Sequence, residues 1–345
     1  MSIGHAPTTA TEQAPPPAGA DGPSGRAAHP VRSMLAHRGV SGLFSVIAVA
    51  IIVYFATLVL PGDAAQAILG KQATPQRLAL LRHQLHLDQP PWEGFLHWAG
   101  GALHGDFGTS LVNQQSVTSL VGPRLLNSLA LVLLTAVISS VLGVVLGAIS
   151  ALRADKASDH VMSSVALVAS ALPEFVVGIF VVLILAVEIK AFPAISILPP
   201  GETIWQQPNE LVLPVLTLVI VTTPYVFRMS RASILEALHS DYAELAQLKG
   251  ASPARLLFRH ALPNSMAPTV QVIGLNLLYL AGGIVLVETV FQYPGVGLAL
   301  VNAIDARDVP TIQFIVLVLA VFYVLLNILT DLIVLLLTPR RRLPR

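Results

Sequence analysis

The sequence predicts an all-α integral membrane protein with six transmembrane helices. Of its 345 residues, 54% are hydrophobic and 11% are charged, and the mean hydropathy is +0.73. Such a chain has too little polar surface for an ordinary soluble globule. Six apolar segments are long enough to cross a bilayer, which takes roughly 17 to 25 helical residues. Because backbone hydrogen bonds must be made internally in lipid, we expect these segments to be helices.

The expected spans are approximately 40–60, 125–151, 162–187, 211–227, 266–287 and 311–337. Residues 1–30 are rich in Pro, Ala and Gly, without a large apolar cluster, and are expected to form a disordered cytoplasmic tail. Residues 31–345 then form one transmembrane domain. The first apolar run is about 21 residues long, longer than a signal-peptide core, which favours a retained span.

The distribution of basic residues predicts the orientation in the membrane. With a cytoplasmic N-terminus, 14 of the 20 Lys and Arg residues lie on the inner side. The outer side keeps Lys71, Arg77, Arg82, Arg124, Lys190 and Arg307. The positive-inside rule therefore favours a multi-pass protein of the cell membrane with both termini in the cytoplasm.

The segment 61–124, between the first two spans, is expected to form an extracytoplasmic cap with two short helices. Thr74 and Pro75 suit the start of the first helix, and Leu78, Leu81 and Leu85 would form its apolar stripe. Trp92, Phe95 and Trp98 in the second helix suit the membrane–water interface.

In the third and fourth spans, Pro173, Pro214 and Pro224 interrupt helix hydrogen bonding and predict kinks. Whether such kinks serve a gate or are ordinary features of membrane helices stays open.

A polar, helix-prone segment separates the fourth and fifth spans, within an expected cytoplasmic loop at 228–264. Ser240 or Asp241 can cap a helix of about two turns, with Glu244 at its positive end and Lys249 at its negative end. Gly250 ends that helix. Ser252 and Pro253 then begin a second helix to about Leu262, whose continuation Pro263 limits.

This helical elbow has features of a docking element. Ala243, Ala246 and Gly250 allow another backbone to approach closely, and Leu245, Leu256 and Leu257 offer apolar anchors. The alternative is an ordinary loop packed on its own helix bundle.

The spacing of Glu244, Ala246, Gly250, Leu262 and Pro263, E-x-A-x3-G-x11-L-P, resembles the signature loop of the membrane subunits of binding-protein-dependent ABC importers. The usual second residue of the motif is Ala, and Leu245 departs from it. The resemblance implies a coupling helix that contacts an ATP-binding subunit through Asp241, Tyr242, Ala243, Glu244, Ala246, Gly250, Leu262 and Pro263.

Four further motifs resemble the dipeptide/oligopeptide/nickel permease branch of that family. They are GDFGTSL at 105–111, LPEFVVGIF at 172–180, RMSRASILEALHSDYAELAQLKG at 228–250 and LVETVFQYPGVGLALVNAIDARDVPTIQ at 286–313. The resemblance implies a type I ABC importer permease fold that forms half of a path for di- or oligopeptides, with nickel or another small solute as the alternative.

The same resemblance implies the partners. These are a second homologous permease subunit, two ATP-binding subunits and an extracytoplasmic solute-binding protein, beside the membrane lipid; no nucleic acid is expected. It also suggests contact with the solute-binding protein at Tyr293, Pro294 and Gly295, which otherwise read as a tight turn.

The sequence lacks the motifs of several enzyme classes. No G-x4-G-K-[ST] phosphate loop occurs. The nearest match is Gly70-Lys71 in AILGKQAT, but the first glycine of the motif would fall at position 65, which is Ala65. No H-E-x-x-H motif and no cysteine occur, which argues against an intramembrane metallohydrolase and excludes thiolate sites. We therefore expect a non-catalytic transport subunit that binds no cofactor or metal, with ATP and Mg²⁺ on its partner subunits.

Glu174 is the ionisable residue of the spans with the strongest functional interest, since a carboxylate at membrane depth is functional by default. It either lines the aqueous path or is a structural partner for a hydroxyl, backbone group or cation of an adjoining helix. Other acids in or near the spans are Glu188, Glu288 and Asp331. So few are untypical of an ion-coupled carrier, which is the competing class.

Four histidines in the cap segment could in principle contact a metal ion, since imidazole suits such ions. They are His83, His86, His97 and His104. Solvated histidines without a fixed geometry are the plainer interpretation.

Overall fold

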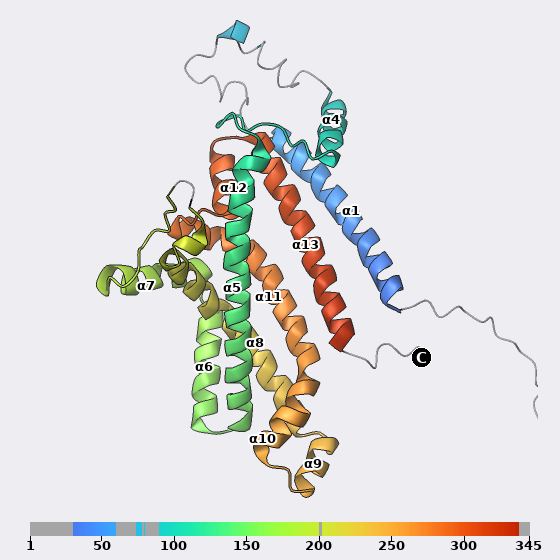
Figure 1. Cartoon of the computed structure of the whole chain (residues 1–345), viewed down its shortest axis with the longest axis vertical. Coiled ribbons are helices and arrows are strands. Elements are labelled where there is room, and N and C mark those ends of the chain that lie inside the picture. Colours follow the sequence, from blue (N-terminus) through green and yellow to red (C-terminus); the bar gives the residue numbers. More distant parts are fainter. Residues whose placement is uncertain (1–29, 60–73, 78, 80–89, 200–201, 338–345) are drawn as a thin grey trace, which may run out of the picture.

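The computed structural model describes residues 30–59, 74–77, 79, 90–199 and 202–337, and within these ranges all regular elements are helical (Figure 1). The predicted tail at 1–30 lies almost wholly outside the described residues. So do His83, His86, Leu78, Leu81 and Leu85 of the cap segment.

At Thr74 the hydroxyl accepts a hydrogen bond from the Arg77 N–H at 3.4 Å, as its predicted capping role requires.

Five helices in the described chain are long and apolar enough to cross a membrane. They are α1 (Pro30–Val59), α5 (Val117–Leu152), α8 (Asn209–Leu238), α11 (Leu262–Phe291) and α13 (Val309–Leu337). The predicted all-α membrane fold is confirmed, and each of these helices contains one of the predicted spans. Pro214 and Pro224 both lie inside the single helix α8.

The predicted third span is not one continuous helix. α6 (Ala157–Ala171) and α7 (Glu174–Val181), with the π-helical η2 (Val182–Glu188), meet at an angle of 105°. Pro173 has no N–H, and its ring excludes Leu172 from the helical region, so Leu172 is extended with φ −85° and ψ 131°. The interruption predicted at Pro173 is therefore confirmed, and the pair makes the sixth predicted span, at 162–187, as a broken one.

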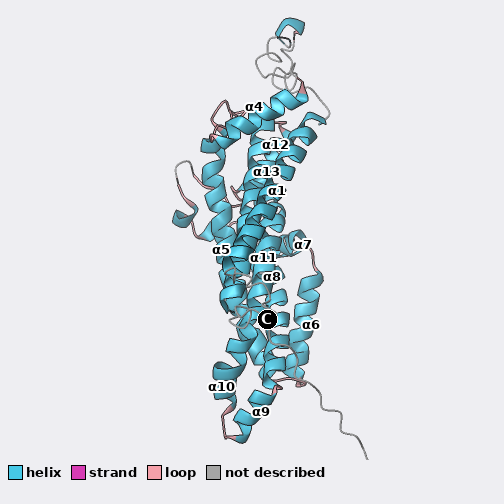
Figure 2. Cartoon of the chain, turned by 90° about the vertical axis from the view of Figure 1, so that its right-hand side faces the viewer, coloured by secondary structure: helices cyan, strands magenta, loops and turns pink. Residues whose placement is uncertain are grey.

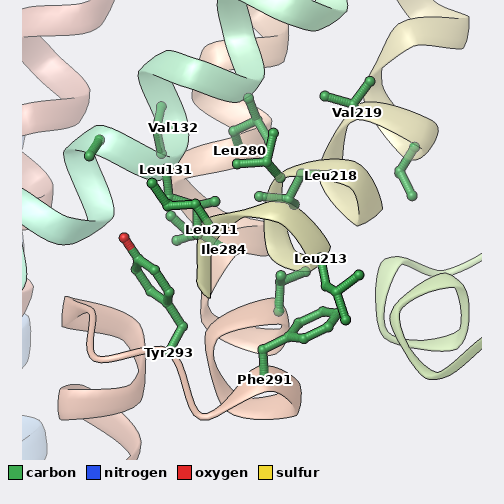
Figure 3. Close-up of a cluster of buried hydrophobic side chains, with 14 of the residues drawn as sticks. Leu131, Val132, Leu211, Leu213, Leu218, Val219, Leu280, Ile284, Phe291 and Tyr293 are labelled. Atoms are coloured by element: carbon green, nitrogen blue, oxygen red, sulfur yellow. The ribbon is translucent and has the colours of Figure 1, made fainter. Parts of the chain in front are cut away.

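α8 is the central helix of the bundle. Most of its apolar part is buried, whereas few residues of the apolar parts of α1 and α13 are buried. It packs most extensively against α5 and also against α11, α6 and α7. Figure 3 shows the core beside it, where Leu131 of α5, Leu218 of α8 and Leu280 of α11 converge.

Small residues bring α5 and α8 close together. A residue with little side-chain bulk recurs every four positions on the buried face of α5: Thr135, Ser139, Gly143, Gly147 and Ala151. A Cβ added at Gly143 would lie 2.6 Å from the Cβ of Val226, and one at Gly147 would lie 2.8 Å from the Cβ of Ser230. Association of membrane helices depends on such small-residue faces.

α1 lies at the edge of the bundle and is held by α13. Arg38 of α1 forms an ion pair with Asp331 of α13 at 2.7 Å, and the Gln313 amide donates to the Thr57 hydroxyl at 2.8 Å. Asp331, noted in the sequence as an acid near the end of a span, thus has an ion-pair partner.

The predicted second helix of the cap segment is α4 (Pro91–Leu103). It contacts α1 through aromatic rings, because the Tyr54 ring lies 5.4 Å from that of Phe95 and 5.6 Å from that of Trp98. Figures 1 and 2 place α4 at one end of the bundle and the short helices α9 and α10 at the other.

Candidate functional site

The segment between α8 and α11 contains the predicted helix α9 (Asp241–Leu248), preceded by Ser240 in extended conformation. Ser240 occupies the capping position, but its hydroxyl donates to the Ala237 carbonyl at 2.6 Å instead of accepting from α9. Asp241 and Glu244 lie in the first turn, where carboxylates complement the positive end of the helix dipole.

Gly250 ends α9 as predicted. Its φ of +82° is left-handed, the Gly250 N–H donates to the Gln247 carbonyl at 2.8 Å, and the Ala251 N–H donates to the Ala246 carbonyl at 3.0 Å. These two bonds form a Schellman motif, which satisfies the last carbonyls of the helix and turns the chain.

The second half of the elbow differs from the prediction. α10 (Pro253–Leu256) passes through the π-turn η4 (Leu257–Ala261) directly into α11, so Pro263 does not stop the helix. The Leu262 N–H donates to the Leu257 carbonyl, five residues earlier. A π-turn widens the helix, which relieves the clash of a proline ring with the preceding turn. The expected independent second helix is therefore the beginning of the fifth long helix.

α9 exposes an apolar strip formed by Tyr242, Leu245 and Leu248, which are 43%, 54% and 80% exposed. Ala243 is fully buried on the opposite side. The other anchors expected from the sequence, Leu256 and Leu257, are buried within the chain instead. The free apolar surface is thus provided by α9, with Phe258 of η4 as a further exposed apolar side chain.

A buried core connects this segment to the long helices. Ala151 of α5, Ile234 and Ala237 of α8, and Leu257 and Ala261 of η4 pack together. Leu262 packs against this core and is partly buried, whereas Pro263 is exposed.

A buried ion pair at the same end of the bundle was not predicted from the sequence. The Arg231 guanidinium of α8 contacts both carboxylate oxygens of Asp159 of α6 at 2.7 and 2.6 Å, and the Ser150 hydroxyl of α5 also donates to Asp159. The signal that could have found it is an acid beside an expected span, with an Arg within reach on another helix, because charges at membrane depth pair with one another. The cluster ties α5, α6 and α8 together near α9.

The predicted turn at Tyr293, Pro294 and Gly295 follows α11 and precedes α12 (Val296–Asp305). The Tyr293 hydroxyl is buried and donates to the Asn127 carbonyl at 2.9 Å, and the Asn127 amide donates to the Pro294 carbonyl at 2.9 Å. Burial raises the pKa of Tyr293, so the hydroxyl stays protonated as a donor. Tyr293 and Gly295 point into the chain, and Pro294 is the member of the three that reaches the surface.

The buried Glu288 carboxylate of α11 packs against the inner side of this turn. It accepts the Ser128 hydroxyl at 2.5 Å and the Leu298 N–H at 3.0 Å, and it fills the space that a Cβ at Gly295 would need. Gly295, the first glycine of YPGVG, is therefore required because the Glu288 carboxylate approaches its backbone.

The GDFGTSL motif contacts the 286–313 motif near the turn at Tyr293. Asp308, before α13, accepts hydrogen bonds from the Ser110 hydroxyl, from the Leu111 N–H at 2.9 Å and from the Thr311 hydroxyl at 2.7 Å. GDFGTSL is thereby fastened to the segment that follows YPGVG.

Glu174 lies far along the bundle from α9 and begins α7 at the break of the third span. Its Oε2 accepts a hydrogen bond from the Tyr279 hydroxyl of α11 at 2.9 Å. The structure therefore separates the predicted site residues into three places: the α9 segment, the Glu174 region and the turn at Tyr293.

No group of three or more His, Asp or Glu side chains that could hold a metal ion occurs in the described part of the chain. Of the two cap histidines within it, His104 has a ring nitrogen 2.8 Å from the Gly100 carbonyl.

Comparison with known proteins relates these features to a family. Residues 143–343 match the family described as binding-protein-dependent transport system inner membrane component, and residues 31–132 match the family described as the N-terminal part of such a membrane component. Among the relatives is the probable peptide ABC transporter permease protein y4tP of Sinorhizobium fredii (strain NBRC 101917 / NGR234). It is 35% identical over 305 residues, which cover 88% of this chain and 97% of the relative. The glutathione transport system permease protein GsiC of Escherichia coli (strain K12) is 33% identical over 283 residues, which cover 82% of this chain and 90% of the relative.

Proposed function

Because the chain belongs to the family of inner-membrane components of binding-protein-dependent transport systems, we propose that it forms half of the translocation path of an ATP-driven importer for peptides. A solute-binding protein delivers the peptide on the outer side, and a second, related permease completes the path. The peptide class is supported by relatives that are named for peptide and glutathione transport.

In this proposal α9 is the coupling helix, and the observation that carries it is its exposed apolar strip. Tyr242, Leu245 and Leu248 project from an end of the bundle that carries many of the basic residues expected in the cytoplasm. A short amphipathic helix of this kind suits a groove of a partner protein. The sequence contains no phosphate loop, so ATP must be hydrolysed by another protein. In this proposal α9 binds that protein, an ATP-binding subunit, and each of the two permeases binds one. ATP and Mg²⁺ bind there, and this chain performs no catalysis.

The helix connections give α9 the properties of a lever. On one side it follows α8 directly, and on the other its Schellman turn leads through α10 and η4 into α11. A rigid displacement of α9 by closing ATP-binding subunits is therefore transmitted to two long helices at once. The Asp159–Arg231 pair holds α6 to the same moving end.

Substitution of Leu248 by Arg tests the docking proposal. Leu248 is 80% exposed, so its replacement leaves the fold intact but places a charge in the docking groove. We expect the affinity of the ATP-binding subunits to fall at least about tenfold, as for a residue near the centre of an interface. The measurement is retention of these subunits on the purified membrane complex, with its ATPase activity.

Leu103→Arg is the matched control, because Leu103 is 88% exposed near the end of α4, at the other end of the bundle. Equal retention of the ATP-binding subunits by both variants would refute α9 as their docking site. Mass spectrometry of the solute held by the co-purified binding protein tests the peptide class. Nickel or another small solute in its place would correct that class within the same importer.

A further inference from the structure

A carboxylate and two tyrosines form a cluster on three helices of the bundle. Glu174 of α7 accepts the hydroxyl hydrogen bond of Tyr279 of α11, and the Tyr279 ring lies 6.2 Å from the ring of Tyr225 of α8, at an interplanar angle of 41°. Tyr225 and Tyr279 are 38% and 42% exposed. We call these three residues the Glu174 cluster.

The Glu174 cluster lies at membrane depth. Tyr225 is near the middle of α8, Tyr279 is well inside the continuous helix that ends at Phe291, and Glu174 is at the break of the third span. Within the described residues, the ion pairs of other acids involve Asp159, near the start of α6, and Asp331, near the end of α13. The hydrogen-bond partner of Glu174 is instead a neutral hydroxyl. Glu174 is only half-buried, and exposing a carboxylate to lipid is costly, so its open side suits an aqueous path.

The surface beside the cluster is also polar. α8 is the most enclosed long helix, yet one stripe of it is exposed, and this stripe includes Tyr225, Arg228 and Glu236. These residues share one helical face because they are three and eleven positions apart. This stripe runs from Tyr225 at membrane depth to Arg228 and Glu236 in the expected cytoplasmic segment, so it suits the cytoplasmic continuation of an aqueous path completed by a second permease.

One oxygen of Glu174 is available for a ligand. Oε2 is engaged by Tyr279, whereas Oε1 accepts no hydrogen bond from a described residue. Oε1 lies beside the α11 backbone, 3.0 Å from the point that a Cβ at Gly283 would occupy, so the glycine leaves room for the carboxylate at this position. A carboxylate that is hydrogen-bonded to one tyrosine, whose ring lies next to a second tyrosine ring, offers the chemistry that recognises an ammonium group, through a charge-assisted hydrogen bond and cation–π attraction.

We propose that the Glu174 cluster is a recognition point within the path for the amino-terminal ammonium group of a peptide in transit. The proposal rests on the peptide-importer function given above and adds a contact made after the solute-binding protein has released its cargo. Glu174 provides the negative charge, Tyr279 orients the carboxylate, and the rings of Tyr225 and Tyr279 flank the bound cation.

Glu174→Gln separates this role from a structural one. Glutamine has almost the same volume and its carbonyl still accepts the Tyr279 hydroxyl, so the substitution removes only the charge. The experiment uses the complete importer in lipid vesicles, with two peptides of one sequence, one with a free amino terminus and one N-acetylated. The sequence is chosen so that the solute-binding protein binds both, and both are supplied at saturation.

Glu174→Gln is expected to lower ATP-dependent uptake of the free-amino peptide about tenfold and to leave uptake of the acetylated peptide and the thermal stability of the complex unchanged. Tyr279→Phe keeps the charge and the ring and is expected to reduce uptake of the free-amino peptide less. Glu93→Gln, on exposed α4, is the matched control and should have no effect.

Equal uptake of the two peptides by Glu174→Gln at the wild-type rate, or an equal loss for both, would overturn the recognition role while leaving the importer function intact. Failure of the wild-type complex to import either peptide would instead overturn the peptide class, and this inference with it.

Discussion

At the scale of single residues, Gly250 has the most demanding backbone conformation near the proposed coupling helix. Its φ of +82° closes the Schellman turn after α9, while the space around it is open, since nothing lies within 4 Å of an added Cβ. The glycine is therefore needed for its conformation and not for lack of room. This distinction makes Gly250 a clean test of how precisely α9 must be held.

Gly250→Ala is expected to strain the turn by about 1–2 kcal/mol, because a Cβ opposes the left-handed conformation. The end of α9 should then fray, so that solute uptake per ATP hydrolysed falls while ATP-binding subunits still bind. The measurement is the ratio of uptake to ATP hydrolysis in vesicles that contain the whole importer.

Gly100→Ala is the control for this change, because Gly100 is inside helix α4 and also has nothing within 4 Å of an added Cβ. An unchanged ratio in Gly250→Ala would mean that coupling does not depend on the Schellman turn.

At the scale of elements, the pairing of α5 with α8 determines the architecture. The four-residue repeat of small residues on α5 allows close approach of the two backbones, and Gly143 lies at its centre. The repeat is visible in the sequence, but nothing in it says which helix will use that face. Only the packed bundle assigns it to α8.

Gly143→Ala is expected to destabilise the bundle by about 1–3 kcal/mol, as overpacking does, since the new methyl group would meet Val226 and the Phe227 backbone. A lower midpoint of thermal unfolding of the purified complex is the measurement. Gly122→Ala in the same helix should cause no such loss, because nothing lies within 4 Å of its added Cβ. Equal midpoints for the two variants would contradict the close contact of α5 with α8.

Prolines illustrate how far element boundaries follow from sequence. Pro173 separates two helices at 105°, whereas Pro214 and Pro224 lie within one helix and Pro263 is absorbed by a π-turn. A proline always removes one hydrogen-bond donor, but the surrounding helices decide whether the chain bends or continues. Local sequence therefore predicts where a helix is weakened and not how it responds.

At the scale of the whole molecule, the absence of cysteine makes the predicted orientation directly testable. Lys156 is exposed in the α5–α6 turn, and Leu103 is exposed at the end of α4, on the opposite end of the bundle. With both termini in the cytoplasm, a membrane-impermeant maleimide should label Leu103→Cys but not Lys156→Cys in right-side-out spheroplasts. After permeabilisation both should be labelled, and the reverse pattern in intact spheroplasts would invert the topology.

Sequence alone predicts a helical membrane protein, the positions of most of its spans, the stop at Gly250 after α9 and the family that its motifs resemble. These properties depend on composition, apolar length and local backbone preferences, which act over a few turns of chain. Only the packed bundle shows that Tyr293 faces inward, that Asp159 pairs with Arg231 across 72 positions of sequence, and that Glu174 accepts a hydrogen bond from Tyr279. These contacts join residues far apart along the chain, so their partners are selected by helix packing and by the cost of leaving a polar group unpaired in the membrane.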